Sequence, residues 1–186
     1  MWCTTSTSLR TWSASGRIRA ALRQEVPGLE DQSPWYEPGR LCLSMDSGPN
    51  CRTSRVPTAR DAGCNTVVCR NANEGMGTSL AAGVRATSDA KGWVIALADM
   101  PFIRPETIRI VTKALQEGAA IVAPSFRGER GHPVGFALRF CEELSSLRGD
   151  NGAREFLGQH PEWVKIFEVD DPGVVHDVDK LSDLES

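Results

Sequence analysis

From residue 65 onward, short runs of apolar residues alternate with stretches in which apolar residues recur at helical spacing. In chain order these segments read TVVCRN, MGTSLAAGVRAT, WVIALAD, RPETIRIVTKALQEG, AAIVAPS, HPVGFALRFCEELSSL, NGAREFLGQH and WVKIFEVDD. Strands that alternate with helices of about 10 to 15 residues are typical of βαβ units and a largely parallel sheet. The pattern therefore predicts an α/β fold.

One apolar run ends in a carboxylate. Residues 94–98 are apolar, Asp99 follows them, and Pro101 forbids continuation of the strand. A continuous apolar run bounded by a turn signal is typical of a strand buried on both faces. Asp99 is then expected at the carboxyl end of an interior strand, where open α/β sheets bind ligands.

The next segment is predicted to be a helix packed behind that strand. Pro105 suits its first turn and Gly118 suits its end. One apolar stripe at helical spacing lies between them: Ile108, Val111, Thr112 and Leu115.

The first sixty residues do not continue this pattern. They are rich in Ser, Thr, Arg and Pro, with one helical candidate in GRIRAALRQEV and one short alternation in LCLSM. No central strand is predicted there, and SGPNCRTSRVPTARDAG has the composition of a loop. We expect one domain over 1–186, divided into a divergent or misread segment at 1–60 and a regular part at 61–186.

Composition narrows the class of ligand. The 21 basic and 24 acidic residues include no Lys/Arg block, so neither nucleic acid nor an anionic membrane is an expected partner. No apolar run approaches the roughly 20 residues of a membrane span, and the start lacks the apolar core of a signal peptide. We expect a cytoplasmic protein with a small ligand. Its six cysteines form no C-x-x-C pair, which favours free thiols over a zinc site.

Three further motifs carry candidate ligand contacts. In NEGMGTSLAAGV, two glycines and two hydroxyl residues stand where a loop enters a helix, whose free N–H groups attract anionic or carbonyl groups. The alternative is a plain helix cap in which Thr78 or Ser79 satisfies the first turn.

In RGERGHPVGF, glycines permit close backbone approach and His132 could donate to a phosphate or a pterin-like ring; a satisfied loop histidine is the alternative. In RGDNGAREFL, Asp150 or Asn151 caps a helix, and Arg154 in its first turn opposes the helix dipole. That arginine either serves an anion or lies on a solvated face.

The tail is acidic. Four aspartates lie within ten positions: Asp170, Asp171, Asp177 and Asp179. Carboxylates gathered at strand ends can hold Mg²⁺ with several waters left on it, although an acidic tail is usually only solvated. A meeting of two distant carboxylates at one sheet rim would explain the charge at Asp99.

In this order, EGMGTSLAAGV, ALADMP, GHPVGF, GDNGAR and VDDPG followed by DVD resemble the molybdenum cofactor cytidylyltransferase family. The resemblance covers roughly residues 62–186. It implies a Rossmann-like three-layer sandwich of the nucleotide-diphospho-sugar transferase type, with helices on both faces of a mostly parallel sheet. The implied reaction moves CMP from CTP to the terminal phosphate of molybdopterin and releases pyrophosphate.

The resemblance also implies roles for individual residues. Asp99 would bind Mg²⁺ and the triphosphate, and Asp179, with Asp177 as its rival, would supply the second metal contact. The remaining implied contacts are nucleotide-binding Gly75, Met76, Gly77, Thr78, Ser79 and Leu80, and molybdopterin-facing His132, Pro133 and Arg154. A molybdenum hydroxylase or its chaperone is the protein partner that the resemblance suggests.

Two departures from the family pattern stand out. Lys180 and Leu181 occupy the place of a Thr-Pro pair, and residues 1–60 lack the loop L-A-A-G-x-x-x-R-M-G and the lysine that hold the triphosphate. A frame error or an erroneous gene start would explain the second departure, and the polypeptide as written should be nearly inactive. The competing hypotheses are an inactive pterin- or nucleotide-binding remnant, and guanylyl or sugar-nucleotide transfer.

Overall fold

The computed structural model describes residues 2–5, 10–11, 42–46, 65–97, 99–149 and 152–178. Its strands are β1 Trp2–Thr5, β2 Arg10–Thr11, β3 Cys42–Asp46, β4 Asn65–Cys69, β5 Gly92–Leu97, β6 Ile121–Phe126, β7 Glu129–Arg130, β8 Val134–Ala137 and β9 Val164–Glu168. Its α-helices are α3 Met76–Arg85, α4 Pro105–Gln116, α5 Cys141–Ser146 and α6 Gly152–Gln159. Short 3₁₀ turns are η1 Ala72–Glu74, η2 Leu138–Phe140, η3 Pro161–Trp163 and η4 Pro172–Val174.

The described strands form one mixed sheet. Its order is β4-β3-β1-β5-β8-β6-β7, with β2 also paired to β5 and β9 to β6. Because β1 and β8 are antiparallel to their main neighbours, β4, β3, β5, β6 and β9 all run in one direction. The predicted α/β class is confirmed, and the carboxyl ends of β5 and β6 lie at the same edge of the sheet.

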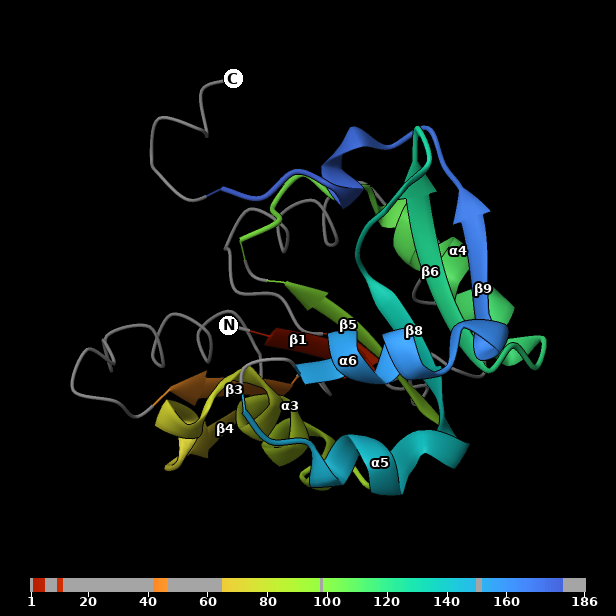
Figure 1. Ribbon diagram of the computed structural model, residues 1–186. Coiled ribbons are helices and arrows are strands. Elements are labelled where there is room, and N and C mark those ends of the chain that lie inside the picture. The colour runs from red at the N-terminus through yellow and green to blue at the C-terminus, as the bar shows by residue number, and fades with distance from the viewer. Residues whose placement is uncertain are drawn as a thin grey trace.

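Alternating side chains of the central strands face two separate helix layers. On β5, Trp93 and Ile95 belong to the core cluster that α3, α5 and α6 cover. Val94 belongs to the opposite cluster, with Val111 of α4. The period of two along a strand therefore places helices on both faces, and Figure 1 shows α6 and α4 on opposite sides of the sheet.

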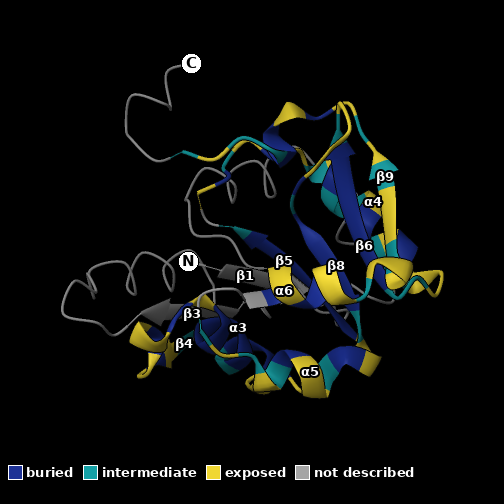
Figure 2. Cartoon of the chain, viewed as in Figure 1, coloured by how far each residue is buried: buried dark blue, intermediate teal, exposed yellow. Residues whose placement is uncertain are grey.

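Strand β5 and helix α4 follow the sequence prediction. Residues 92–96 are buried, so the strand lies in the middle of the sheet (Figure 2). Helix α4 starts at Pro105, and Gly118 with φ 96° follows its end. Val111 of its apolar stripe is buried against the sheet.

The prediction that residues 1–60 hold no central strand was wrong. Strand β1 lies between β3 and β5, antiparallel to both, and the predicted LCLSM strand corresponds to β3. Ladder hydrogen bonds use backbone N–H and C=O groups that every non-proline residue carries, so WCTT can pair without a Val/Ile/Leu run. Most of the other residues in 1–60 lie outside the described ranges.

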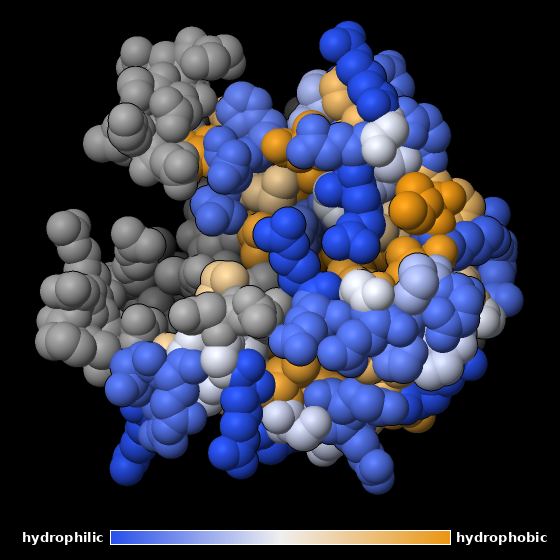
Figure 3. All heavy atoms as spheres, viewed as in Figure 1, coloured by the Kyte–Doolittle hydropathy of each residue, from blue (hydrophilic) through white to orange (hydrophobic). Residues whose placement is uncertain are grey.

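The outer surface in the view of Figure 3 is mainly hydrophilic, and hydrophobic atoms emerge there only in small separate spots. Exposed large apolar side chains are scattered over several elements: Val68, Met76, Phe102, Ile110, Leu138, Trp163 and Ile166. Within the described ranges, no helix has both the length and the apolar content to cross a membrane.

Candidate functional site

Asp99 lies at the carboxyl edge of the sheet, as predicted. Strand β5 ends at Leu97, and the chain turns at once, with the Met100 amide donating to the Leu97 carbonyl at 3.4 Å. Asp99 is exposed, whereas the adjacent Met100 is buried. The carboxylate is therefore available to a ligand at the rim of the sheet.

Residues 171–178, called the tail segment below, pass directly beside this turn. The Val178 amide donates to the Asp99 carbonyl at 2.7 Å, and the His132 amide donates to the Val174 carbonyl at 2.8 Å. Phe102 meets His176 edge to face at 5.3 Å. The tail segment thus joins two loops that are far apart in the sequence, the one after β5 and the one before β8.

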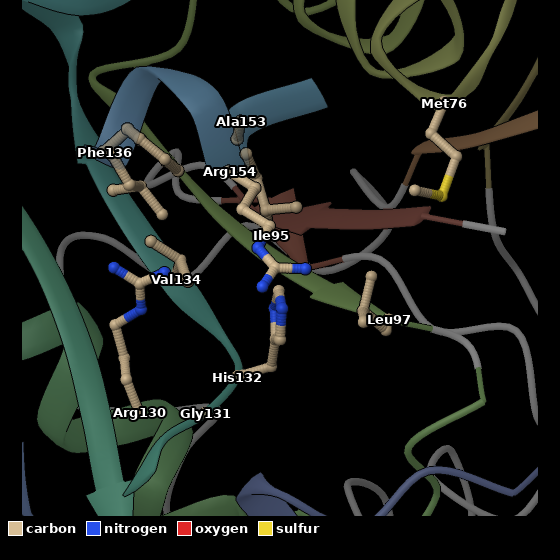
Figure 4. Close-up of a pocket in the computed structure, with 11 residues that line it drawn as sticks. Met76, Ile95, Leu97, Arg130, Gly131, His132, Val134, Phe136, Ala153 and Arg154 are labelled. Carbon is tan, nitrogen blue, oxygen red and sulfur yellow. The ribbon is translucent and has the colours of Figure 1, made fainter. Parts of the chain in front are cut away.

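A cavity of about 400 Å³ opens next to these loops. Three cationic or imidazole side chains line it, Arg130, His132 and Arg154, and Figure 4 shows Arg154 and His132 pointing toward one another. Its other walls are mainly apolar: Met76, Ile95, Leu97, Gly131, Val134, Phe136, Ala153 and Leu157. Apolar walls with a few convergent polar groups, two of them guanidinium groups, suit a small ligand that carries an anionic group.

His132 is held in its neutral form. Burial is the main cause that lowers its pKa below the ordinary value of 6.5, and the nearby Arg130 guanidinium lowers it further. A hydrogen bond with the Ile95 backbone and the Asp99 carboxylate act in the opposite direction without reversing the shift. At neutral pH this imidazole can therefore both donate and accept a hydrogen bond.

Acidification should weaken the fold through His132. Because its folded pKa is lowered, the unfolded chain takes up a proton first as the pH falls below about 6.5, and the free energy of unfolding drops. The groups that face this imidazole are Asp99, Arg130, Arg154 and the Ile95 backbone. Urea unfolding of the wild type and His132→Gln between pH 7.5 and 5 measures the effect. The wild type should lose more stability than the variant over that range; equal losses would contradict the pKa assignment.

Helix α3 begins at a close contact with the turn before α6. Gly75 has φ 116°, a conformation that favours glycine, and the Gly77 amide donates to the Gly149 carbonyl at 2.8 Å. A Cβ on Gly77 would lie 2.9 Å from the Arg148 carbonyl oxygen. The GMG motif therefore brings α3 against the turn that leads to Arg154.

Of the six predicted nucleotide contacts, Met76 lines the cavity. Thr78 and Ser79 are buried, and Leu80 lies in the main core cluster. No side chain caps α3, and the buried Thr78 hydroxyl has no hydrogen-bond partner, so the alternative of a plain cap by Thr78 is not seen. Pro133 is buried beside His132 and does not line the cavity.

The structure describes two of the three predicted metal ligands, Asp99 and Asp177. Asp177 is exposed and lies next to Val178, which is bonded to Asp99. Asp179, like Asp150 and Asn151, lies outside the described residues. Among the residues that are described, no group of three or more His, Cys, Asp or Glu side chains converges as a metal site. The predicted pair of metal ligands, Asp99 with Asp177 or Asp179, stays a prediction.

Sequence reasoning missed two residues of this region. Arg130 lines the cavity, two positions before His132 in the same glycine-rich turn. Asp171 was grouped with the acidic tail, but it is buried and bonded to the start of α4. The signal for Asp171 was the Asp-Pro-Gly sequence, because Asp before such a turn commonly bonds the backbone two residues on.

Comparison with known proteins places this geometry in context. A family model for the MobA-like NTP transferase domain matches residues 47–164, more than half of the chain. Among curated proteins, the chain is 33% identical over 116 residues to the purine catabolism protein PucB of Bacillus subtilis (strain 168). That match covers 60% of this chain and 55% of PucB, so the chain spans little more than half the length of this relative.

Solved structures share the fold. The structure of Rv0371c from Mycobacterium tuberculosis H37Rv has a TM-score of 0.61 and 25% identity, covering 78% of this chain and 74% of that protein. The same protein in complex with manganese has a TM-score of 0.58 at 25% identity, covering 78% and 75%. Molybdopterin-guanine dinucleotide biosynthesis protein A from Archaeoglobus fulgidus has a TM-score of 0.50 at 16% identity, covering 77% and 74%, a likeness of fold alone.

Proposed function

The chain belongs to the MobA-like NTP transferase family, and on this premise we propose that it transfers CMP from CTP to the terminal phosphate of molybdopterin. The observation that carries the proposal is the meeting of three parts at one sheet edge. These are the exposed Asp99, the tail segment with Asp177, and the cavity lined by Arg130, His132 and Arg154. We place the reaction in the cytoplasm.

The residues at the rim fit a divalent cation. Mg²⁺ in phosphate-transfer sites usually keeps several waters and takes one or two carboxylates together with substrate phosphates. Asp99 together with Asp177 or Asp179 would offer such a set, and the manganese complex of Rv0371c supports a divalent metal in this fold. When bound, the cation would neutralise charge that develops on the leaving pyrophosphate.

The residues that line the cavity suit molybdopterin, the proposed acceptor of CMP. Arg154 and Arg130 would hold its phosphate, and neutral His132, whose N–H is engaged by the Ile95 backbone, would accept a hydrogen bond from the pterin ring. The apolar walls from β5 and β8 would pack against that ring. The start of α3, where Met76 lines the cavity, would face the base and ribose of CTP.

The reaction is a substitution at phosphorus. An oxygen of the acceptor phosphate forms a bond to the α-phosphorus of CTP, and the bond from that phosphorus to the bridging oxygen breaks. The electron pair leaves with pyrophosphate. Because residues 1–60 offer no recognisable phosphate loop with its lysine, we expect turnover to be slow, since each lost transition-state donor costs about a hundredfold.

The test is an assay matrix. The protein is incubated with Mg²⁺, molybdopterin or the molybdenum cofactor, and CTP, GTP or a sugar 1-phosphate with a nucleoside triphosphate. Pyrophosphate and the coupled product are measured by mass spectrometry. CTP-dependent formation of the pterin dinucleotide supports the proposal. Product with GTP or the sugar phosphate alone changes the substrate class, and ligand binding without product favours the inactive remnant.

A further inference from the structure

The tail segment is held at three points. Its Val174 carbonyl accepts the His132 amide, and its Val178 amide donates to Asp99. Just before Val174, Gly173 lies so close to the Phe102 carbonyl oxygen that an added Cβ would stand 2.2 Å from it. The positions of Asp99 and His132 relative to each other therefore depend on where the tail segment begins.

That beginning is Asp171, whose side chain is buried and fully engaged. Its Oδ2 accepts the Arg104 amide at 2.9 Å and the Thr107 hydroxyl at 2.6 Å, and its Oδ1 accepts the Gly173 amide at 3.1 Å. The Arg104 guanidinium lies 4.0 Å from Oδ1 and also donates to the Asp170 carbonyl at 2.6 Å. One carboxylate thus ties the tail segment to the first turn of α4.

The contacts of the Asp171 carboxylate depend on one another because they share one buried charge. Asp171 is only 2% exposed, and a buried carboxylate is tolerated where donors and a counter-charge surround it. The backbone amide and hydroxyl that it accepts belong to the start of α4, where the helix dipole also favours an anion. Removal of the charge would weaken all of these contacts together.

We propose that Asp171 is a positioning residue of the site: it touches no ligand, but it fixes the positions of Asp99, Asp177 and His132 relative to one another. The inference rests on the proposed function, because the site that Asp171 would position is the proposed cation and acceptor site. Its geometric part, the anchoring of Val178 and Val174, can be tested separately.

The decisive variant is Asp171→Asn. Asparagine keeps the size but has one acceptor oxygen, so at least one of the three hydrogen bonds and the charge facing Arg104 are lost. Asp170→Asn is the matched control, because it removes the neighbouring charge while Arg104 contacts only the Asp170 backbone. Thr107→Val removes one hydrogen bond and serves if Asp171→Asn does not fold. Leu144→Ala, in the core cluster far from these contacts, controls for general loss of stability.

The first measurement is amide hydrogen exchange of the intact chain, followed by NMR or mass spectrometry. In Asp171→Asn, the Val178 and His132 amides should exchange about tenfold faster or more, since both bonds involve the tail segment. Asp170→Asn should leave both unchanged. Unchanged protection in a folded Asp171→Asn, or in Thr107→Val if Asp171→Asn is unfolded, would overturn the inference. Equal acceleration in Leu144→Ala at matched stability would also overturn it.

The second measurement is Mn²⁺ affinity, read by electron paramagnetic resonance without nucleotide turnover. Asp99→Asn reports on the proposed site itself, and Asp171→Asn reports on its positioning. We expect weaker Mn²⁺ binding in both, with the wild-type value retained in Asp170→Asn within about twofold. If Asp99→Asn weakens Mn²⁺ binding and Asp171→Asn does not, the inference about Asp171 is wrong while the proposed cation site stands. If Asp99→Asn leaves Mn²⁺ affinity unchanged, the proposed cation site is wrong. The hydrogen-exchange rates of Val178 and His132 then still test whether Asp171 anchors the tail segment.

Discussion

In a version of the protein in which the phosphate loop and its lysine have been restored, replacement of Asp99 by asparagine should lower the rate of cytidylyl transfer about a hundredfold or more while the protein stays folded. Asparagine has nearly the same size, so packing at the exposed rim changes little. It lacks the negative charge that a hard divalent cation requires of its protein ligand. The rate of pyrophosphate release, measured at saturating CTP and Mg²⁺, checks the prediction, and thermal unfolding checks the fold.

Glu142→Gln is a suitable control for this experiment. It removes one exposed carboxylate from the first turn of α5, away from the cavity lining. Its rate should match that of the wild type. A rate for Asp99→Asn within about threefold of the wild type, far from the loss expected of an electrostatic contact, would reduce Asp99 to a structural residue.

The second carboxylate can be identified in the same assay. Asp177 directly precedes Val178, whose amide donates to the Asp99 carbonyl, and Asp179 follows Val178 in the sequence. Only the true ligand should reproduce the loss seen in Asp99→Asn. The family resemblance favours Asp179, and Asp177 is the alternative.

The sequence allowed the centre of the fold to be predicted because local and global signals agree there. The apolar run before Asp99 admits only a strand buried on both faces, and Pro101 and Pro105 determine where it ends and where α4 begins. The position of Asp99 followed from these signals. His132 and Arg154 were expected to serve one ligand, and both line the same cavity.

What could not be predicted depends on contacts between distant segments. The burial of Asp171 requires the start of α4, which lies 64 to 67 residues earlier in the chain. Arg130 gains its place from the pairing of β6 with β7, and it carries no signal of its own in the sequence. The central position of β1 likewise rests on backbone pairing with β3 and β5, which the hydrophobic pattern does not encode.

A substitution in the tail segment is expected to lower the stability of the fold strongly. Gly173→Ala should lower the free energy of unfolding by about 2 kcal/mol or more, because its Cβ would meet the Phe102 carbonyl oxygen at 2.2 Å and backbone cannot rotate away. For a chain of this size that corresponds to a fall in Tm of about 4 °C or more, measured by calorimetry. The site should suffer as well, since Phe102 belongs to the loop that carries Asp99.

Gly158→Ala is the matched substitution with the opposite expected sign. Gly158 lies inside α6, and an added Cβ meets nothing within 4 Å. Alanine in a helix interior is favoured over glycine by about 0.5 to 1 kcal/mol, so this variant should be slightly more stable than the wild type. A Tm of Gly173→Ala equal to or above that of the wild type would contradict the close approach of Gly173 to the Asp99 loop. A fall in Gly173→Ala alone would show that glycine is required where the tail segment crosses that loop, because any side chain there would push the segment away from Asp99.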